Sequence, residues 1–170
     1  KGTDELVVAT AAGEVFKYRA ANGEILWQTD LPNPISAQPG YGKGKLFIAD
    51  LHGNVHALDA GTGEQLWTFA DGSSFETPPT FGEDRVFVTD VLDTLIALDA
   101  KTGKELWRYA RPRPEYFTLQ GSGQPSVRDG EVFCGFADGH LLAFQLDGGD
   151  IIWDADLTAG KEKFVDVDGA

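Results

Sequence analysis

The sequence is poor in the residue types that build several kinds of site. It has one cysteine, Cys134, in 170 residues, so an intrachain disulfide and a metal site built from several cysteines are both excluded. It has no methionine, and since a native reading frame begins with Met, we expect a mature or trimmed piece without its targeting segment. No apolar run approaches the ~20 residues of a membrane-spanning helix, so we expect no direct membrane insertion by this segment.

Basic charge is also scarce. The chain has 14 Lys and Arg residues against 27 Asp and Glu residues, a formal net charge of −13. Nucleic-acid binding needs clustered cations, and so does a polybasic grip on anionic lipid, so this balance argues against both. Hydrophobic residues make up 42% of the chain and aromatic residues 11%, enough for a packed core, and we therefore expect an ordered domain.

What the sequence does contain is a repeat. Four tryptophans follow one another at spacings of 40, 40 and 46 residues, and each stands four residues after a glycine. A period of about 40–50 residues built from short strands is typical of a propeller blade. The sequence therefore predicts one propeller fragment of four units, at about 1–40, 41–80, 81–126 and 127–170. The repeated residues are Trp27, Trp67, Trp107, Trp153, Gly23, Gly63, Gly103 and Gly149.

The strand pattern favours stacked sheets. Residues 95–98 (LIAL) and 141–144 (LLAF) are apolar at every position, whereas a strand with one wet face alternates polar and apolar residues. Sheets that are buried on both sides pack face to face around a propeller axis. No segment has a sustained helical period. The predicted fold class is all-β, a β-propeller with four-stranded antiparallel blades.

The repeated residues have structural explanations. We expect each tryptophan to dock into the seam between adjacent blades, the alternative being that it fills its own blade. Asp59 and Asp99 can accept backbone hydrogen bonds in the turn before the tryptophan, with the following glycine in a left-handed conformation. Arg19 and Gln145 replace these aspartates in units one and four, so those turns should be less well tied.

Residues 57–67 (ALDAGTGEQLW) and 97–107 (ALDAKTGKELW) resemble the tryptophan-docking repeat of the pyrroloquinoline-quinone-type propellers. Rings of this type usually have seven or eight blades, so the resemblance implies about half a ring, opening one strand into its first blade. Two bare blade faces would favour a homodimer. The alternative is that residues 164–170 pair with the first blade and seal a four-bladed ring.

The last third resembles the BamB family of outer-membrane assembly lipoproteins, in residues 117–125, 130–139 and 166–168. The resemblance implies that two loops dock on the periplasmic domains of a BamA-like barrel-inserting protein. Gln120 replaces the family's arginine, which puts a charge contact there in doubt. Unit three is also six residues longer before unit four, and a longer loop on a rigid scaffold is a common place for recognition. The implied contacts are Phe117, Leu119, Gln120, Asp166 and Asp168.

The function implied is a non-catalytic scaffold in outer-membrane β-barrel protein assembly and insertion, with unfolded outer-membrane proteins as further partners. It would lie in the periplasm, peripheral to the outer membrane, with its lipid anchor outside this segment. One alternative is a fragment of a quinoprotein dehydrogenase, although that family's vicinal cysteine pair is missing here. The other is a ligand-sensing or substrate-binding propeller.

The remaining chemically suggestive residues predict no catalytic, cofactor or metal site. His52 and His56 are four apart, but a strand–turn geometry would separate them, so His56 is expected to be packed in the core or to line the channel. His140 is expected in a turn. Cys134 aligns with Ile48 and Val88 and is expected to be a small core hydrophobe.

Overall fold

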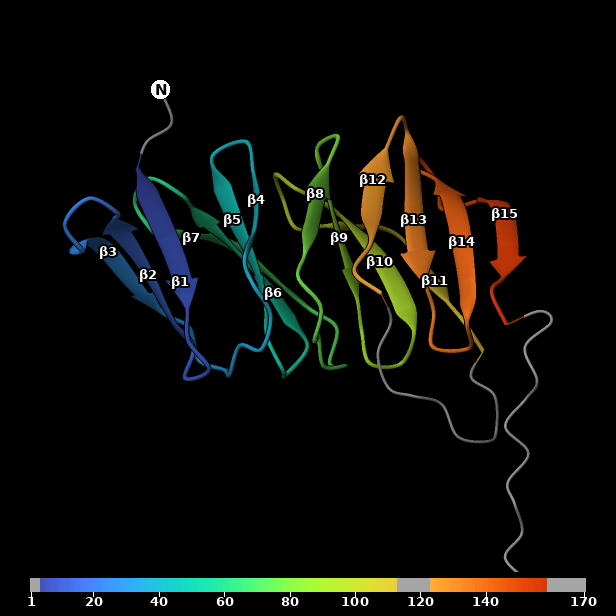
Figure 1. The fold of residues 1–170 in the computed structure, drawn as a ribbon, viewed down its shortest axis with the longest axis horizontal. Helices are drawn as coiled ribbons and strands as arrows, with labels where there is room; N and C mark the ends of the chain where they lie inside the picture. Colours follow the sequence, from blue (N-terminus) through green and yellow to red (C-terminus); the bar gives the residue numbers. More distant parts are fainter. Residues whose placement is uncertain (1–3, 113–122, 159–170) are drawn as a thin grey trace, which may run out of the picture.

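The computed structural model describes residues 4–112 and 123–158 and forms four antiparallel sheets side by side in chain order (Figure 1). The first sheet has three strands and each of the others has four. No helix occurs among these residues. The predicted all-β fold, a partial β-propeller of four blades, is confirmed.

Within each sheet, every strand pairs with the next one along the chain. The first sheet contains β1 (Glu5–Ala9), β2 (Glu14–Arg19) and β3 (Glu24–Asp30). The second contains β4 (Gly40–Gly42), β5 (Lys45–Ala49), β6 (Asn54–Asp59) and β7 (Gln65–Ala70). The third contains β8 (Thr80–Gly82), β9 (Arg85–Thr89), β10 (Thr94–Asp99) and β11 (Glu105–Ala110). The fourth contains β12 (Ser126–Arg128), β13 (Glu131–Gly135), β14 (His140–Gln145) and β15 (Ile151–Asp156).

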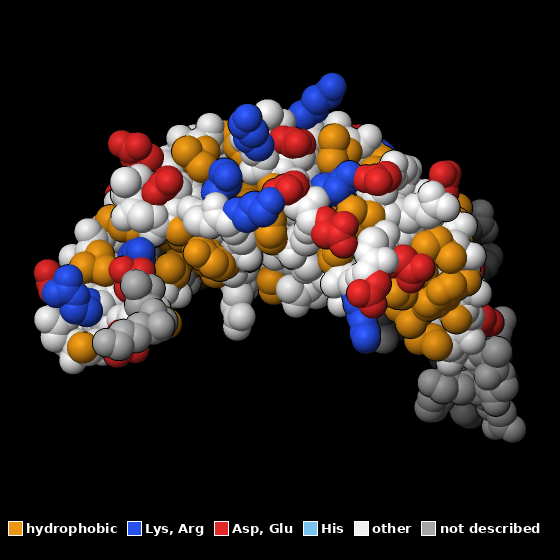
Figure 2. Space-filling view, turned by 90° about the horizontal axis from the view of Figure 1, so that it is seen from above, with side chains coloured by type: hydrophobic (Ala, Val, Ile, Leu, Met, Phe, Trp, Pro, Cys, Tyr) orange, Lys and Arg blue, Asp and Glu red, His pale blue; other side chains and the backbone are white. Residues whose placement is uncertain are grey.

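The short first strands of the last three sheets lie beside one another. β4 contacts β8, and β8 contacts β12, so these strands form the inner edges of successive blades. Figure 2 shows that the sheets together follow an arc that is hollowed on one side. The first sheet has no such inner strand among the described residues.

The hydrophobic core is divided among the seams between sheets. One cluster joins Val15 and Leu31 to Leu46 and Leu58 of the second sheet. The next two clusters join sheets two and three, and sheets three and four, in the same way. Strands of the inner sheets are therefore apolar on both faces because each face contributes to a different seam.

Tryptophans close these seams. The indole N–H of Trp27 donates to Ala60 O at 3.3 Å, that of Trp67 to Ala100 O at 3.3 Å, and that of Trp107 to Leu146 O at 2.9 Å. In each case the ring also covers a glycine of the following sheet, so closely that a Cβ atom there would lie 2.5–2.7 Å from the indole. These glycines are Gly63, Gly103 and Gly149.

The turns before these tryptophans differ as their sequences do. Asp59 Oδ1 accepts hydrogen bonds from the backbone N–H groups of residues 61 and 62, and Asp99 does the same in the third sheet. Arg19 instead pairs with Glu24 at 2.7 Å, and the turn after Gln145 has the backbone bond from Gly149 N to Gln145 O. Accordingly, the capping hydrogen bonds that hold the middle two turns come from an aspartate side chain.

One local prediction is wrong. His140 is the first residue of β14 rather than a turn residue, and its Nδ1 lies 2.6 Å from Asp154 Oδ1 on the neighbouring strand β15. The cross-strand pairing of residues 140 and 156 begins at this point, so the histidine is drawn into the ladder by its pairing and its carboxylate neighbour.

Candidate partner-binding rim

The five residues that the sequence nominates for partner contact lie outside the described residues. They are Phe117, Leu119, Gln120, Asp166 and Asp168. The described residues that precede these two segments lie at the same end of the third and fourth sheets. Arg111 follows β11, and Leu157 follows β15.

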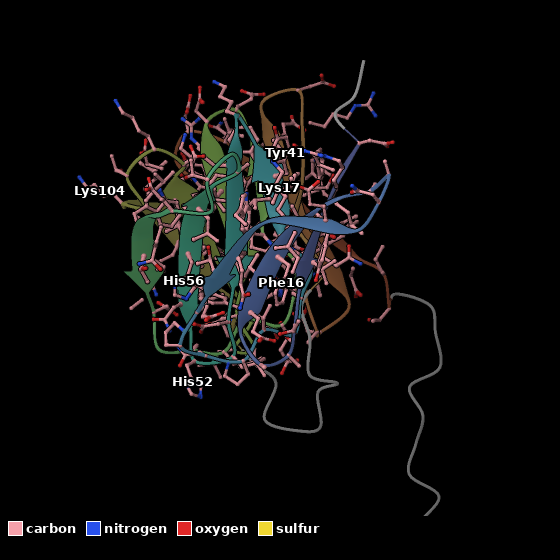
Figure 3. The ribbon with its side chains drawn as sticks, turned by 90° about the vertical axis from the view of Figure 1, so that its left-hand side faces the viewer. Phe16, Lys17, Tyr41, His52, His56 and Lys104 are labelled. Atoms are coloured by element: carbon pink, nitrogen blue, oxygen red, sulfur yellow. The ribbon has the colours of Figure 1, made fainter. Side chains whose placement is uncertain are left out.

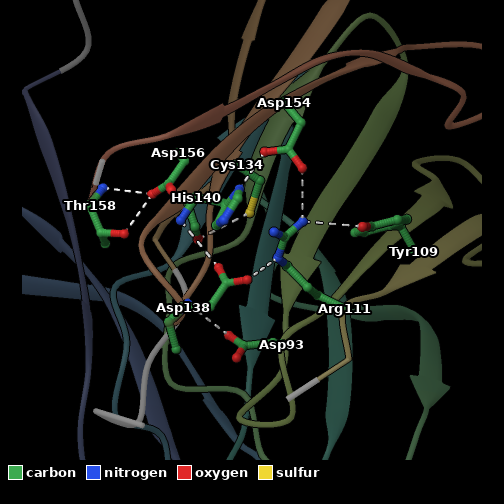
Figure 4. Close-up of polar contacts among 11 residues, drawn as sticks. Asp93, Tyr109, Arg111, Cys134, Asp138, His140, Asp154, Asp156 and Thr158 are labelled. Atoms are coloured by element: carbon green, nitrogen blue, oxygen red, sulfur yellow. Dashed lines mark hydrogen bonds and ion pairs between the residues drawn. The ribbon is translucent and has the colours of Figure 1, made fainter. Parts of the chain in front are cut away.

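The β13–β14 turn contacts both Arg111 and Leu157. The guanidinium of Arg111 forms an ion pair with Asp138 in this turn, and Leu157 N donates to Gly139 O at 3.0 Å. Figure 4 shows Arg111 between Asp138 and Asp154, with Thr158 close to the same turn. Arg111 and Leu157, which precede the two nominated segments, therefore contact the same turn.

Arg111 is held on several sides. Its Nη1 lies 3.3 Å from Asp154 Oδ2 and 3.4 Å from the Tyr109 hydroxyl, and its Cζ lies 5.7 Å from the centroid of the Phe136 ring. Burial disfavours the charged guanidinium, but the bonds to Asp138 and Tyr109 and the nearby carboxylates outweigh it, so the pKa of Arg111 is raised. The side chain therefore fixes the third sheet to the fourth as a permanent cation.

The carboxylate of Asp154 contacts both the imidazole of His140 and the guanidinium of Arg111. The hydrogen bond with His140 is the main reason that the pKa of Asp154 is lowered, and the charge of Arg111 adds to it against a smaller effect of burial. We name Arg111, Asp138, His140 and Asp154 the rim cluster. It is an ion-paired surface at one end of the seam between sheets three and four.

A second polar network surrounds Asp50 in the second sheet, and sequence reasoning missed it. Its fully buried carboxylate bonds with His56 Nε2 at 3.0 Å, Asn33 Nδ2 at 2.9 Å and Asn54 Nδ2 at 2.9 Å. Burial alone would raise the pKa of Asp50, but these bonds reverse the effect and lower it. His52 Nδ1 lies 2.8 Å from Asn33 Oδ1, so the two histidines that spacing predicts to be separate meet one network.

The network around Asp50 is built for packing. His56 is 3% exposed, and its other ring nitrogen lies 3.3 Å from Thr68 Oγ1. The carboxylate thus gives hydrogen-bond partners to several polar groups at once, among them the buried imidazole of His56. Within residues 4–112 and 123–158, no group of three or more His, Cys, Asp or Glu side chains is arranged to hold a metal ion.

Cys134 lies in the seam between sheets three and four. Burial, with a smaller contribution from the Asp93 carboxylate, raises the pKa of its thiol to about 12. Because the thiolate is the reactive form, this cysteine has the properties of an inert core residue. None of the described residues belongs to a helix that is long and apolar enough to cross a membrane.

A groove of about 900 Å³ borders β1. It is lined by the β1 strand, by residues 35–39 and by Tyr41, whose side chain is 66% exposed. In the third sheet, the equivalent residue Phe81 packs on Gly42 of the inner strand before it. The groove therefore occupies the place that an inner strand has in the other sheets, and we assign no ligand to it.

The chain is similar to several solved structures. It has 28% identity and a TM-score of 0.83 with BamB from Moraxella catarrhalis, over 90% of this chain and 46% of that one. A computationally designed protein, Ika8, shares 19% identity at a TM-score of 0.76, over 92% and 47% of the two chains. A europium-containing methanol dehydrogenase shares 19% identity at a TM-score of 0.74, over 92% of this chain and 40% of that one. The last two likenesses show the fold alone.

The chain spans less than half the length of each of these structures. No curated protein matches the sequence. A family model described as "Outer membrane protein assembly factor BamB" matches residues 4–170, which is nearly the whole chain. This chain, a partial propeller of four pyrroloquinoline-quinone-type repeats, therefore belongs to the BamB family.

Proposed function

We propose that the chain is a non-catalytic scaffold of outer-membrane protein assembly, located in the periplasm at the outer membrane. The family match over residues 4–170 carries this proposal. Its partner would be a BamA-like protein that inserts barrels into the membrane, and unfolded outer-membrane proteins would be its clients.

The docking surface would be the rim next to the rim cluster. Support comes from the β13–β14 turn, which holds both Arg111 and Leu157. Residues 117–120 and 166–168 would then lie on one side of the propeller and contact one partner together. A contact surface formed by two loops on a rigid scaffold suits protein recognition, since the scaffold limits the entropy lost on binding.

Binding to the periplasmic domains of a BamA-like protein tests the proposal, with the affinity measured by calorimetry. We expect Leu119→Ala and Asp168→Asn each to weaken binding by about tenfold or more, since contacts at the centre of an interface carry most of its energy. Asp129→Asn is the matched control, because Asp129 lies in the β12–β13 turn at the opposite rim, exposed and left-handed (φ 51°). Equal affinity for all variants, or no binding by the parent, would reject the proposal.

A quinone-dependent dehydrogenase is the competing function. The dehydrogenases with this fold share 19% identity or less with the chain, which supports a common fold and no further likeness. Titration with pyrroloquinoline quinone distinguishes the two functions. Saturable uptake together with alcohol-dependent dye reduction would favour the enzyme, and the scaffold predicts neither.

A further inference from the structure

The turns β1–β2, β5–β6, β9–β10 and β13–β14 occupy the same place in the four sheets, and each contains one residue with a positive φ. In three of them this residue is a glycine, Gly13, Gly53 or Gly139, with φ of 96°, 80° and 85°. In the third sheet it is Asp93, with φ 62°. A left-handed backbone suits glycine better than aspartate, so an aspartate at this position needs a compensating contact.

The glycines also make room for the linker, the segment that follows the last strand of a sheet and leads to the next sheet. A Cβ atom at Gly13 would lie 2.5 Å from Leu31 O. One at Gly53 would lie 2.7 Å from Gly72 N. Asp93 carries such an atom, and backbone atoms cannot approach a Cβ so closely, so the chain after β11 must leave more room at this turn.

The same turns contain a backbone N–H that bonds across the seam. Leu51 N donates to Pro34 O at 2.9 Å, and Val91 N donates to Ser74 O at 2.9 Å. Both acceptors belong to the linker of the preceding sheet, each four residues after its last strand ends. At the first two seams, therefore, a linker carbonyl holds the turn of the following sheet.

At the third seam the Asp93 carboxylate holds the equivalent N–H. This N–H belongs to Ala137 of the β13–β14 turn, and it donates to Asp93 Oδ1 at 3.4 Å. The backbone carbonyl of Asp93 accepts Arg111 N at 3.1 Å. Figure 4 shows Asp93 next to Arg111 and Asp138, which form the ion pair of the rim cluster. Asp93 thus links the end of β11 to the turn that Arg111 pairs with.

A second aspartate of the third sheet provides a comparison. Asp84 also stands at a glycine position, since Gly44 and Gly130 occupy it in the second and fourth sheets, and its φ is 65°. Its side chain is 68% exposed and forms a surface ion pair with Lys43. Asp93, by contrast, is 3% exposed. The two aspartates share the left-handed backbone, but only the carboxylate of Asp93 is buried between two sheets.

We propose that Asp93 is a positioning residue of the partner-binding rim. At the third seam its carboxylate replaces the linker carbonyls of the first two seams and fixes the β13–β14 turn beside Arg111. This turn is then held without a bond to the linker, and the linker between units three and four is the one that is six residues longer in the sequence. The inference rests on the proposed function, because it assigns Asp93 to the same docking surface.

The affinity for the periplasmic domains of a BamA-like protein, measured by calorimetry, tests this assignment. Asp93→Gly restores the residue of the other three turns and removes the carboxylate, and we expect binding to weaken by about tenfold, because the rim loses its preorganisation. Asp93→Asn keeps an oxygen that accepts the Ala137 N–H and a side chain that tolerates positive φ, so it should bind within about threefold of the parent.

Asp84→Gly is the matched control. It relieves the same backbone conformation on the opposite rim, and an exposed ion pair contributes little to stability. Figure 3 marks the two rims, with His52 of the β5–β6 turn at one and Lys104 of the β10–β11 turn toward the other. We expect the affinity of Asp84→Gly to equal that of the parent.

Hydrogen exchange of the Ala137 amide measures the contact without a partner. Exchange should be about tenfold faster in Asp93→Gly than in the parent or in Asp84→Gly, because the amide loses its acceptor. Equal exchange in the three proteins would overturn the contact. If the parent binds and Asp93→Gly binds equally well, the positioning role is wrong and the proposed function stands. Absence of binding by the parent would reject both.

Discussion

Trp67 lies over Gly103 so closely that a Cβ atom at residue 103 would be 2.5 Å from the indole ring. The glycine also has a positive φ of 72°, so two independent requirements exclude a side chain at this position. The same relationship recurs at the other two seams. Each of these tryptophans thus contacts the blade that follows its own in the sequence, and their regular spacing reflects this repeated contact.

Truncation of a seam tryptophan should be costly. We expect Trp67→Ala to lower the free energy of unfolding by about 3–5 kcal/mol, since it leaves a cavity between two sheets and an unpaired carbonyl at Ala100. Urea denaturation followed by circular dichroism measures the change. A loss below about 1 kcal/mol would mean that the ring contributes little to the seam.

The glycine under the ring should be coupled to it. Gly103→Ala should cost about 2 kcal/mol or more, from backbone strain plus the clash with the indole. Gly44→Ala is the control for strain alone, because Gly44 has a φ of 74° with nothing within 4 Å of its Cβ position. Combined with Trp67→Ala, the Gly103 substitution should cost no more than the control, and full additivity would contradict the contact.

The buried carboxylate of Asp50 should make stability fall in acid. Its pKa in the folded state lies below the ordinary value of 3.8, so it stabilises the fold above that value and loses this effect as the pH falls through the lowered pKa. We expect Asp50→Asn to be less stable than the parent at pH 7 and to show a shallower loss of stability below about pH 4. Parallel pH profiles for the two proteins would contradict this role.

Cys134 should resist modification while the protein is folded. With its pKa raised to about 12, almost no thiolate exists at pH 8, and the thiol is also buried. Ellman's reagent should therefore label it only at the rate of unfolding, and completely in denaturant. Rapid labelling of the native chain would show that the seam between sheets three and four opens readily.

Arg111 should matter for partner binding as well as for the packing of the third sheet on the fourth. We expect Arg111→Ala to weaken binding to the BamA-like partner by about tenfold, because the ion pair holds the lead to one nominated segment beside the other. Arg108→Ala is the matched control, as Arg108 also pairs with two carboxylates, Asp71 and Glu105, on the exposed side of β11. The two variants should bind equally if the rim is not the docking surface.

The repeat made the blades predictable because each strand's chemistry recurs at a fixed offset. Trp67, Asp59 and Gly63 needed only their spacing to be read as seam and turn residues. Lys17 could not be read in that way, since it stands where Ala57 and Ala97 stand and reaches Ala60 O of the next sheet at 2.8 Å. That contact depends on a neighbour 43 residues away, which the local pattern does not contain.

The polar networks could not be predicted from the sequence either, because their members come from separate segments of the chain. Asp50 collects Asn33, Asn54 and His56 from a loop and a strand, and in the sequence they are unremarkable turn residues and one odd histidine. His140 is predicted in a turn, yet the pairing of β14 with β15 begins at this residue. The nominated contacts at 117–120 and 166–168 lie outside the described residues and stay predictions.

Because every seam has the same parts, the sheets form a linear array in which each one leans on its immediate neighbours. Among the described residues, the second and third sheets have two such supports, and the first and fourth have one. Amide hydrogens should then exchange fastest at both extremities and slowest in the middle. The same kind of substitution should therefore lower the free energy of unfolding by different amounts in different sheets, depending on how many neighbouring sheets pack against the substituted one.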